Sequence, residues 1–243
     1  MSKHIKMNPK LKMFIPVVKG LAKILGKDYE VNLHDVSMPE HSLVLCENGH
    51  VTGRSAGGPM TDFGLFMLQS DDYRSKDGIF NYLAKNNRGE LIKCSCIFIR
   101  DETEKVIAFL GVNYDISRAT AAKGLIESLL HLDMENVEQY PEVLPEPRRS
   151  PDSAQFPVPV REWFAQDIEE VVGDSLAQIK KKVGKPLSYL SKGEKQQVIR
   201  ELHDKGFFLL KGSVDILAQE MQNTKYTIYS YIRAVQKTDK EEN

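Results

Sequence analysis

The chain of 243 residues is long for one domain and comfortable for two, and its 41% hydrophobic content against 28% charged residues excludes wholesale disorder. The formal net charge of −1 excludes a globally basic nucleic-acid binder, so any basic surface must be local. No apolar run approaches the roughly 18 residues of a membrane span, and the cysteines (Cys46, Cys94 and Cys96) cannot form a complete disulfide set, which indicates reduced thiols in a cytoplasmic protein.

The first periodic segment predicts an opening helix. Apolar residues recur there at helical spacing, namely Leu11, Phe14, Ile15, Val18, Leu21, Ala22 and Leu25. Pro16 predicts a kink or a late helix start, because proline has no amide hydrogen to donate.

The next elements are short. Residues 29–35 alternate in polarity like a strand, and the apolar run at 43–46 ends in a turn signal at 47–49. The apolar residues at 65–68 and 79–83 are expected to form short helices.

Two longer apolar runs, at 91–100 and 106–115, flank the polar residues 101–105, which predicts an antiparallel hairpin. Together with the earlier strands, this hairpin predicts an antiparallel sheet with helices on one face. A helical stretch follows at 117–132, with Ala121, Leu125, Leu129 and Leu132 on one stripe. That helix would pack back on its own domain, the commoner outcome, or against a second copy of the chain.

A proline-rich stretch divides the chain. Six of the eleven prolines lie between Pro141 and Pro159, where they prevent a regular helix or a central strand. We therefore expect a first domain at 1–140, a linker at 141–159 and a helical domain at 160–243.

The helical domain begins with an amphipathic stretch at 160–183. Residues 191–194 form a capping box before a helix that Gly206 ends. Ser213 would cap the next helix, and a third helix begins near Thr224 after a short turn.

The last two helices predict a helix-turn-helix at about 212–236. Ala218 supplies the small side chain that a close helix crossing requires, and no acidic residue occurs between Asn223 and Lys237. Donors and positive charge on the outward face favour contact with DNA phosphates. The residues expected to face DNA are Thr224, Lys225, Tyr226, Tyr229, Ser230 and Arg233. Spacing alone leaves open an ordinary three-helix bundle with a solvated polar face.

Several strings resemble, in order and spacing, the YheO-type PAS-like domain and the helix-turn-helix that accompanies it. They are YEVNLHDV, ENGHVTGRSAGGPMTDFGL, YRSKDG, LIKCSCIFIRDETEKVIAFLGVNYDIS and, near the C-terminus, KGFFLLKGSVDILAQEMQNTKYTIYSYI. The resemblance covers nearly the whole chain apart from the linker and the ends. Two positions depart from the common helix-turn-helix pattern: Gln222 stands where glycine often makes the turn, and Asn223 where an aliphatic residue usually packs.

The resemblance implies an α+β architecture: an N-terminal PAS-like antiparallel sheet with covering helices, and a C-terminal all-α helix-turn-helix domain. The family comprises bacterial transcriptional regulators, including a repressor of D-arginine catabolism. The implied function is therefore a ligand-responsive DNA-binding regulator, a repressor by family analogy, that acts as a homodimer on paired half-sites of double-stranded DNA. A PAS-like scaffold or sensor that acts through a protein partner is the alternative.

PAS-like sheets commonly hold a small molecule between the concave sheet and the covering helices. The candidate ligand-binding residues are Arg54, Thr61, Asp62, Ser95 and Asn113. Arg54 and Asp62 could bind the carboxylate and the amine of an amino acid through charge-assisted hydrogen bonds, or could instead pair with each other and cap a loop. Cys94 and Cys96 share one strand face and are expected to pack in the core, with redox sensing or metal binding as the alternatives.

A serine hydrolase is the competing enzyme hypothesis. Residues 53–57 match the G-x-S-x-G nucleophile elbow, with Ser55 as nucleophile, but this chemistry needs a strand before the turn, a helix after it and a suitable histidine. The later histidines, His131 and His203, are poorly placed for a triad, so the match is interpreted as fortuitous. The sequence shows no P-loop, dinucleotide fingerprint, haem or flavin signature, and we expect no cofactor and no metal site.

Overall fold

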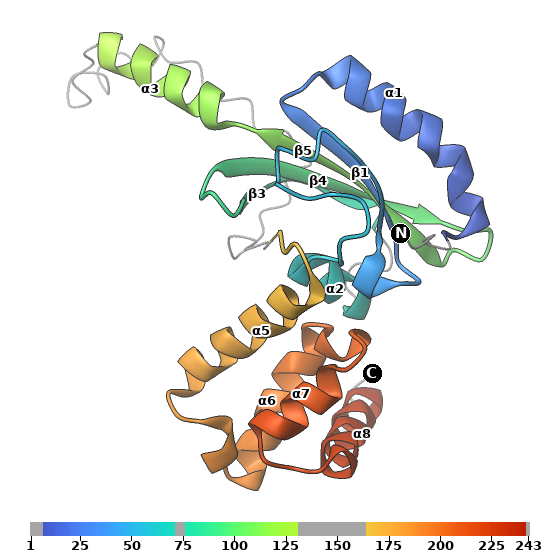
Figure 1. Cartoon of the computed structure of the whole chain (residues 1–243), viewed down its shortest axis with the longest axis vertical. Coiled ribbons are helices and arrows are strands. Elements are labelled where there is room, and N and C mark those ends of the chain that lie inside the picture. The colour runs from blue at the N-terminus through green and yellow to red at the C-terminus, as the bar shows by residue number, and fades with distance from the viewer. Residues whose placement is uncertain (1–6, 71–75, 131–163, 242–243) are drawn as a thin grey trace, which may run out of the picture.

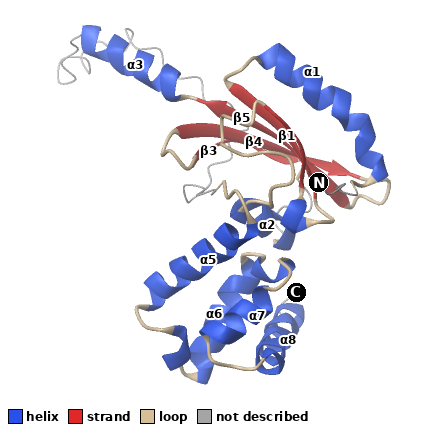
Figure 2. Ribbon diagram, in the orientation of Figure 1, coloured by secondary structure: helices blue, strands red, loops and turns tan. Residues whose placement is uncertain are grey.

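The computed structural model describes residues 7–70, 76–130 and 164–241, which form a sheet domain and a helical domain (Figures 1 and 2). The predicted linker at 141–159 lies outside these ranges. No helix within the described ranges is both long and apolar enough to span a membrane.

The sheet has five antiparallel strands in the order β2-β1-β5-β4-β3. The strands are β1 (Tyr29–Asp35), β2 (Leu43–Glu47), β3 (Gly78–Lys85), β4 (Leu91–Arg100) and β5 (Val106–Asp115). The predicted strands and the hairpin are confirmed. The predicted helix at 79–83 is wrong, because these residues pair with β4, where Ile79 lies opposite Cys96 and Tyr82 opposite Cys94. Pairing with β4 and burial of the apolar side chains determine the conformation of these residues more strongly than the spacing of their apolar positions does.

Helices cover both faces of the sheet, whereas the sequence led us to expect one. Helix α1 (Ile15–Leu25) packs on one face of the sheet. It begins only at Ile15, with Pro16 in its first turn, so Pro16 marks a late helix start and not a kink. Helix α2 (Asp62–Gln69) covers the other face. Because successive strand residues point to opposite faces, Phe109 packs in the cluster under α2 while Leu110 packs in the cluster under α1.

Helix α3 (Ser117–Leu130) projects from the end of β5 (Figure 1). Its apolar residues are exposed: Leu125 by 61%, Ile126 by 58% and Leu129 by 70%. The expectation that this helix packs back on its own domain is therefore wrong for its described side chains.

The helical domain contains α5 (Ile168–Val183), α6 (Lys192–Asp204), α7 (Ser213–Glu220) and α8 (Lys225–Glu241). The predicted capping box is present, since the Glu194 amide donates to Ser191 Oγ and the Ser191 amide donates to Glu194 Oε2. Gly206 ends the following segment in a left-handed conformation, as predicted. The predicted Ser213 cap is wrong: Gly212 takes the N-cap position, and Ser213 is buried in the first turn.

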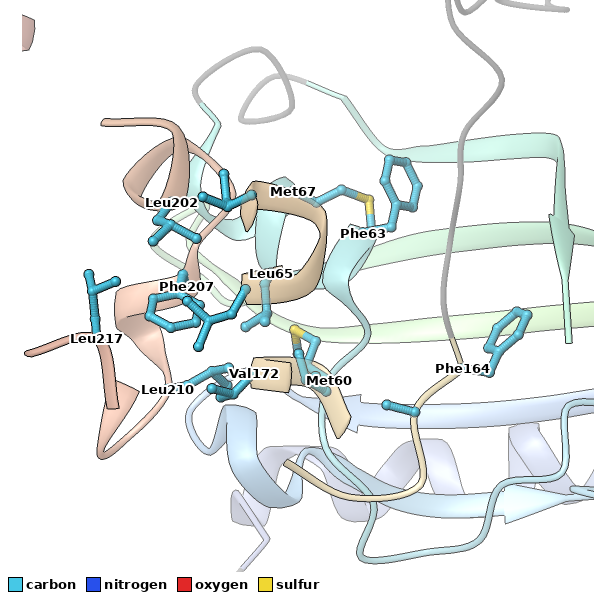
Figure 3. Close-up of a cluster of buried hydrophobic side chains, with 14 of the residues drawn as sticks. Met60, Phe63, Leu65, Met67, Phe164, Val172, Leu202, Phe207, Leu210 and Leu217 are labelled. Carbon is cyan, nitrogen blue, oxygen red and sulfur yellow. The ribbon is translucent and has the colours of Figure 1, made fainter. Parts of the chain in front are cut away.

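The two domains share one hydrophobic cluster. Leu65 of α2 lies beside Phe207 of the helical domain, with Leu202 and Leu210 nearby (Figure 3). Two polar contacts flank this cluster: Gln69 Nε2 lies 3.3 Å from His203 Nε2, and the Lys211 amide donates to Glu40 Oε1 at 2.9 Å. The helical domain is thus packed on α2 rather than tethered by the linker alone.

Candidate functional site

A small cavity lies between the concave face of the sheet and α2. Its lining comes from β1, the loop before α2, α2 itself, β3, β4, β5 and the first described residue of the helical domain, Phe164. Its free volume is about 30 Å³. On this measure one water needs roughly 10–15 Å³, so the cavity has room for two or three waters and not for an amino acid.

Four of the predicted ligand residues, Arg54, Thr61, Ser95 and Asn113, line this cavity, and Asp62 does not. The Arg54 guanidinium donates to the carbonyl of Pro59 and is buried. Thr61 caps α2, since the Gly64 amide donates to Thr61 Oγ1 at 3.0 Å. Asp62 Oδ1 accepts from the Phe63 amide at 2.8 Å in the first turn of the same helix. The loop and the helix end that hold these residues are therefore part of the cavity wall.

Ser95 and Asn113 differ in orientation. Asn113 lies opposite Cys94, whereas Ser95 lies opposite Val112. Alternation along the strand therefore directs the Ser95 side chain away from the face that carries Asn113. The Ser95 hydroxyl accepts from the Asn81 amide at 3.0 Å.

Sequence reasoning missed a row of polar side chains on β1. Glu30, Asn32 and His34 alternate with apolar neighbours, a pattern that usually indicates a solvent-facing side, yet all three are buried. Glu30 Oε1 accepts from Asn32 Nδ2 at 2.8 Å and from Asn113 Nδ2 at 3.0 Å. Glu30 Oε2 accepts from the amide and the hydroxyl of Thr52. This network fixes the two amide side chains that line the cavity.

His34 is the titratable ring in the lining. Its Nδ1 lies 2.8 Å from Ser42 Oγ. Burial, together with the nearby charge of Arg54, holds the pKa of His34 well below its usual value. The cavity therefore presents a neutral imidazole at physiological pH.

The cysteines pack as expected. Cys94 and Cys96 are buried in the core under α2, which confirms the prediction of core packing. Burial raises the pKa of the Cys46 thiol to about 12, so this cysteine stays protonated at neutral pH.

Phe164 was also missed. It is 1% exposed and reaches the cavity from the segment just before α5, about 50 residues along the chain from Asn113. Phe164 is an aromatic residue that follows the proline-rich stretch, and no periodic pattern there identifies its partner. The sequence therefore offered no indication that it contacts the sheet domain.

The structure does not form a nucleophile elbow at Ser55. The preceding strand, β2, ends at Glu47, and the next helix begins only at Asp62, so residues 53–57 form a loop. Within the described ranges, no hydrogen bond joins the exposed Ser55 hydroxyl to a histidine. This geometry lacks the strand-turn-helix that the hydrolase chemistry needs.

The turn between α7 and α8 has the geometry of a Schellman motif. Gln222 takes a positive φ of 49°, its amide donates to the Gln219 carbonyl at 3.1 Å, and the Asn223 amide donates to the Ala218 carbonyl at 2.9 Å. Lys195 Nζ from α6 donates to the Met221 carbonyl at 3.0 Å and to Asn223 Oδ1 at 2.7 Å. Asn223, which replaces the usual aliphatic residue of the helix-turn-helix pattern, is thus hydrogen-bonded to Lys195, and this lysine stabilises the turn.

Helix α8 packs on α6 and α7 through one face, with Ile228, Ile232 and Val235 buried as predicted. Its other face is free of cover: Tyr226 is 78% exposed and Tyr229 48%. The remaining predicted DNA-facing residues, Thr224, Lys225, Ser230 and Arg233, are exposed as well.

One acidic side chain lies close to this face. Lys225 Nζ lies 2.6 Å from Asp215 Oδ1 of α7, and this hydrogen bond raises the pKa of Lys225. Arg233, two helical turns further on, extends the positive charge of the face along α8.

Comparison with known proteins agrees with both domains. Residues 5–131 match the family described as the YheO-like PAS domain, and residues 171–233 match a family described as an HTH domain. An uncharacterized protein of Haemophilus influenzae is 26% identical over 221 residues, covering 90% of this chain and 88% of that protein. The uncharacterized protein YheO of Escherichia coli is 27% identical over 231 residues, covering 94% of this chain and 86% of that protein.

Among solved structures, the PAS domain of the fruit-fly ELK potassium channel matches 43% of this chain and 98% of that domain, at 16% identity and a TM-score of 0.29. The family matches locate a PAS-like domain and a helix-turn-helix domain in the order in which the strings of the sequence resemble them. The chain belongs to the family of proteins with a YheO-like PAS domain.

Proposed function

We propose that this chain is a ligand-responsive transcriptional repressor that binds double-stranded DNA through α8. A PAS-like domain joined to a helix-turn-helix domain indicates a regulator rather than an enzyme. The observation that carries the proposal is the position of α2, whose Gly64 and Met67 line the cavity while its Leu65 packs on the helical domain. One short helix thus contacts both the site where a ligand would bind and the domain that would bind DNA.

The DNA-binding surface is the exposed face of α8. Tyr226, Tyr229 and Arg233 would reach base edges or phosphates, and Thr224, Lys225 and Ser230 would add hydrogen bonds to the backbone. The absence of acidic residues from Asn223 to Lys237 supports this assignment, since phosphate contact requires a locally positive face.

The effector is a small metabolite, with an amino acid as the candidate class. Of the residues predicted for its site, we retain Arg54, Thr61 and Asn113, because Asp62 does not line the cavity and the Ser95 side chain points to the other face of the sheet. The neutral His34 ring and the amide of Asn32 add hydrogen-bonding groups that suit a polar ligand.

The active form is a homodimer in the cytoplasm, because helix-turn-helix proteins read paired half-sites. The exposed apolar residues of α3, Leu125, Ile126 and Leu129, supply a surface that a second copy would cover. Leu125→Glu with Leu129→Glu should lower the solution mass to that of a monomer, whereas Lys123→Glu on the same helix should leave it unchanged. A native chain that is already monomeric at micromolar concentration would contradict this assembly.

The proposal is tested in two steps. Genomic fragments that the purified chain retains should contain a shared paired motif, and a panel of amino acids should raise its melting temperature and change its affinity for those fragments. If the chain retains no specific genomic fragment, the proposal of a repressor is contradicted.

The free volume of only about 30 Å³ favours one alternative, a PAS-like scaffold that acts through a protein partner. Specific DNA binding without any response to a broad metabolite panel would support this scaffold instead.

A further inference from the structure

The cavity cannot hold a metabolite unless one of its lining side chains moves, because about 30 Å³ is far below the few hundred cubic ångströms typical of ligand sites. The large hydrophobic and aromatic side chains in the lining, apart from the hydrogen-bonded His34, are Met60, Met67, Tyr82, Phe109 and Phe164. Which of them moves decides how occupation of the cavity is transmitted.

Most of these side chains are held by regular structure. Tyr82 and Phe109 belong to β3 and β5, and their rings pack on Phe63 and Phe98 with centroids 5.1 Å apart in each pair. Met67 belongs to α2, and the Met60 amide donates to the Pro39 carbonyl at 2.7 Å. The backbones that carry these four side chains are thus held by a strand, a helix or a backbone hydrogen bond.

Phe164 is held differently. It lies outside any helix or strand, and neither Phe164 nor Ala165 makes a backbone hydrogen bond to another described residue. Its ring is nevertheless 1% exposed, at the edge of the cluster shown in Figure 3. Among the described residues, side-chain packing rather than backbone hydrogen bonding therefore holds it in the cavity.

The segment that carries Phe164 leads directly into the helical domain. Asp167 caps α5 by accepting from the Glu170 amide at 2.9 Å, and Val171 and Val172 of that helix pack in the shared cluster. A displacement of Phe164 would thus pull on the first turn of α5.

We propose that Phe164 is a tethered internal occupant of the sensor cavity, which the effector displaces. This inference rests on the proposed sensor function and adds its mechanism: the effector takes the space of the phenyl ring and releases the start of α5. The effector class that fits combines an apolar group no larger than a phenyl ring with a polar end for Asn32 and Asn113.

Hydrogen exchange of the full-length chain, without DNA or effector, tests this inference. Phe164→Ala should raise the exchange rates of the amides at 168–176 at least tenfold, because loss of a buried phenyl ring strongly weakens local docking. Toluene, which replaces the deleted ring, should bind this variant and return those rates toward native values. Phe80→Ala, the same deletion at a half-exposed position of β3, should leave exchange in α5 unchanged.

Unchanged exchange in α5 of Phe164→Ala, or a faster exchange that toluene does not reverse, would overturn the inference. If Phe164→Ala does not fold, Phe164→Leu provides the test, since exchange in α5 no faster than in Phe80→Leu would overturn it equally. Because the measurement uses no DNA, failure of the repressor proposal would leave its result intact. If the native chain binds DNA in response to an effector but Phe164→Ala shows unchanged hydrogen exchange in α5, only the role of Phe164 as a tethered occupant is refuted, and the repressor proposal stands.

Discussion

Individual buried polar residues define the cavity, and one of them, His34, has a side chain whose usual pKa lies near neutrality but is held well below that value here. Its ring is enclosed by the sheet, the loop that carries Arg54 and the Ser42 hydroxyl. A protonated imidazole there would be desolvated beside a guanidinium, which explains the lowered pKa.

Acidification should therefore destabilise the fold through His34. The unfolded chain binds a proton at this residue near pH 6.5 and the folded chain does not, so the free energy of unfolding falls as pH drops below 6.5, by up to about 1.4 kcal/mol per pH unit. His34→Gln should flatten the dependence between pH 6.5 and 5 in urea unfolding, and His41→Gln on an exposed turn should not. Equal pH slopes in the native chain and in His34→Gln would contradict the assignment.

Gln222 is a second residue whose backbone can be tested. A left-handed conformation costs a residue with a Cβ about 1 kcal/mol relative to glycine, so Gln222→Gly should raise the free energy of unfolding by about that amount. Gln219→Gly, in the regular part of α7, should lower it by about 1 kcal/mol. Destabilisation by both substitutions would show that Gln222 is not left-handed.

Residue identity predicted some of these roles and missed others. The position of Gln222 in a known pattern indicated a turn, and the turn occurs there. The role of Asn223 depends on Lys195 from another helix, and the burial of Asn32 and His34 depends on α2 and Phe164 covering the sheet. Contacts between segments that are distant in the sequence produce no periodic pattern of residues, so they could not be predicted from the sequence.

At the level of elements, α2 and the end of α6 approach each other closely at Gly206. A Cβ on Gly206 would lie 2.5 Å from the Leu65 carbonyl oxygen, and Gly206 also has a φ of +73°. Gly184 has a φ of +72° with no heavy atom within 4 Å of its would-be Cβ. Substitutions at Gly184 and Gly206 therefore distinguish the cost of backbone strain, which both positions share, from the cost of a clash between the domains, which only Gly206 has.

Alanine at each glycine should give different results. Gly184→Ala should cost about 1 kcal/mol of unfolding free energy, from strain alone. Gly206→Ala should cost a further 1–3 kcal/mol or so from overpacking, and should increase hydrogen exchange in α2. Equal costs for the two variants would mean that α2 and α6 are not in close contact.

Element prediction succeeded where the pattern favoured one period. The strands β4 and β5 were identified with their hairpin, whereas β3 was mistaken for a helix because the apolar residues at 79–83 fit both periods. The coverage of both sheet faces could not be inferred, since it depends on where α1 and α2 fold back.

At the level of the whole molecule, the cavity, α2, the shared cluster and α8 form a continuous path of packed residues. Such a path regulates DNA binding only if the effector binds two arrangements of the domains with different affinities. The order of the domains was predictable from resemblance. Their packing was not, because Leu65 and Phe207 meet across about 140 residues of sequence.

The salt dependence of DNA affinity is the sharpest test of DNA binding through α8. On one duplex recovered from the retained genomic fragments, the logarithm of the association constant of the native chain should fall linearly with the logarithm of salt concentration. Arg233→Ala should reduce the magnitude of this slope by about 1, whereas Lys93→Ala, which removes one charge from the distant sheet, should leave it unchanged. The same slope in Arg233→Ala as in the native chain would contradict DNA binding through α8.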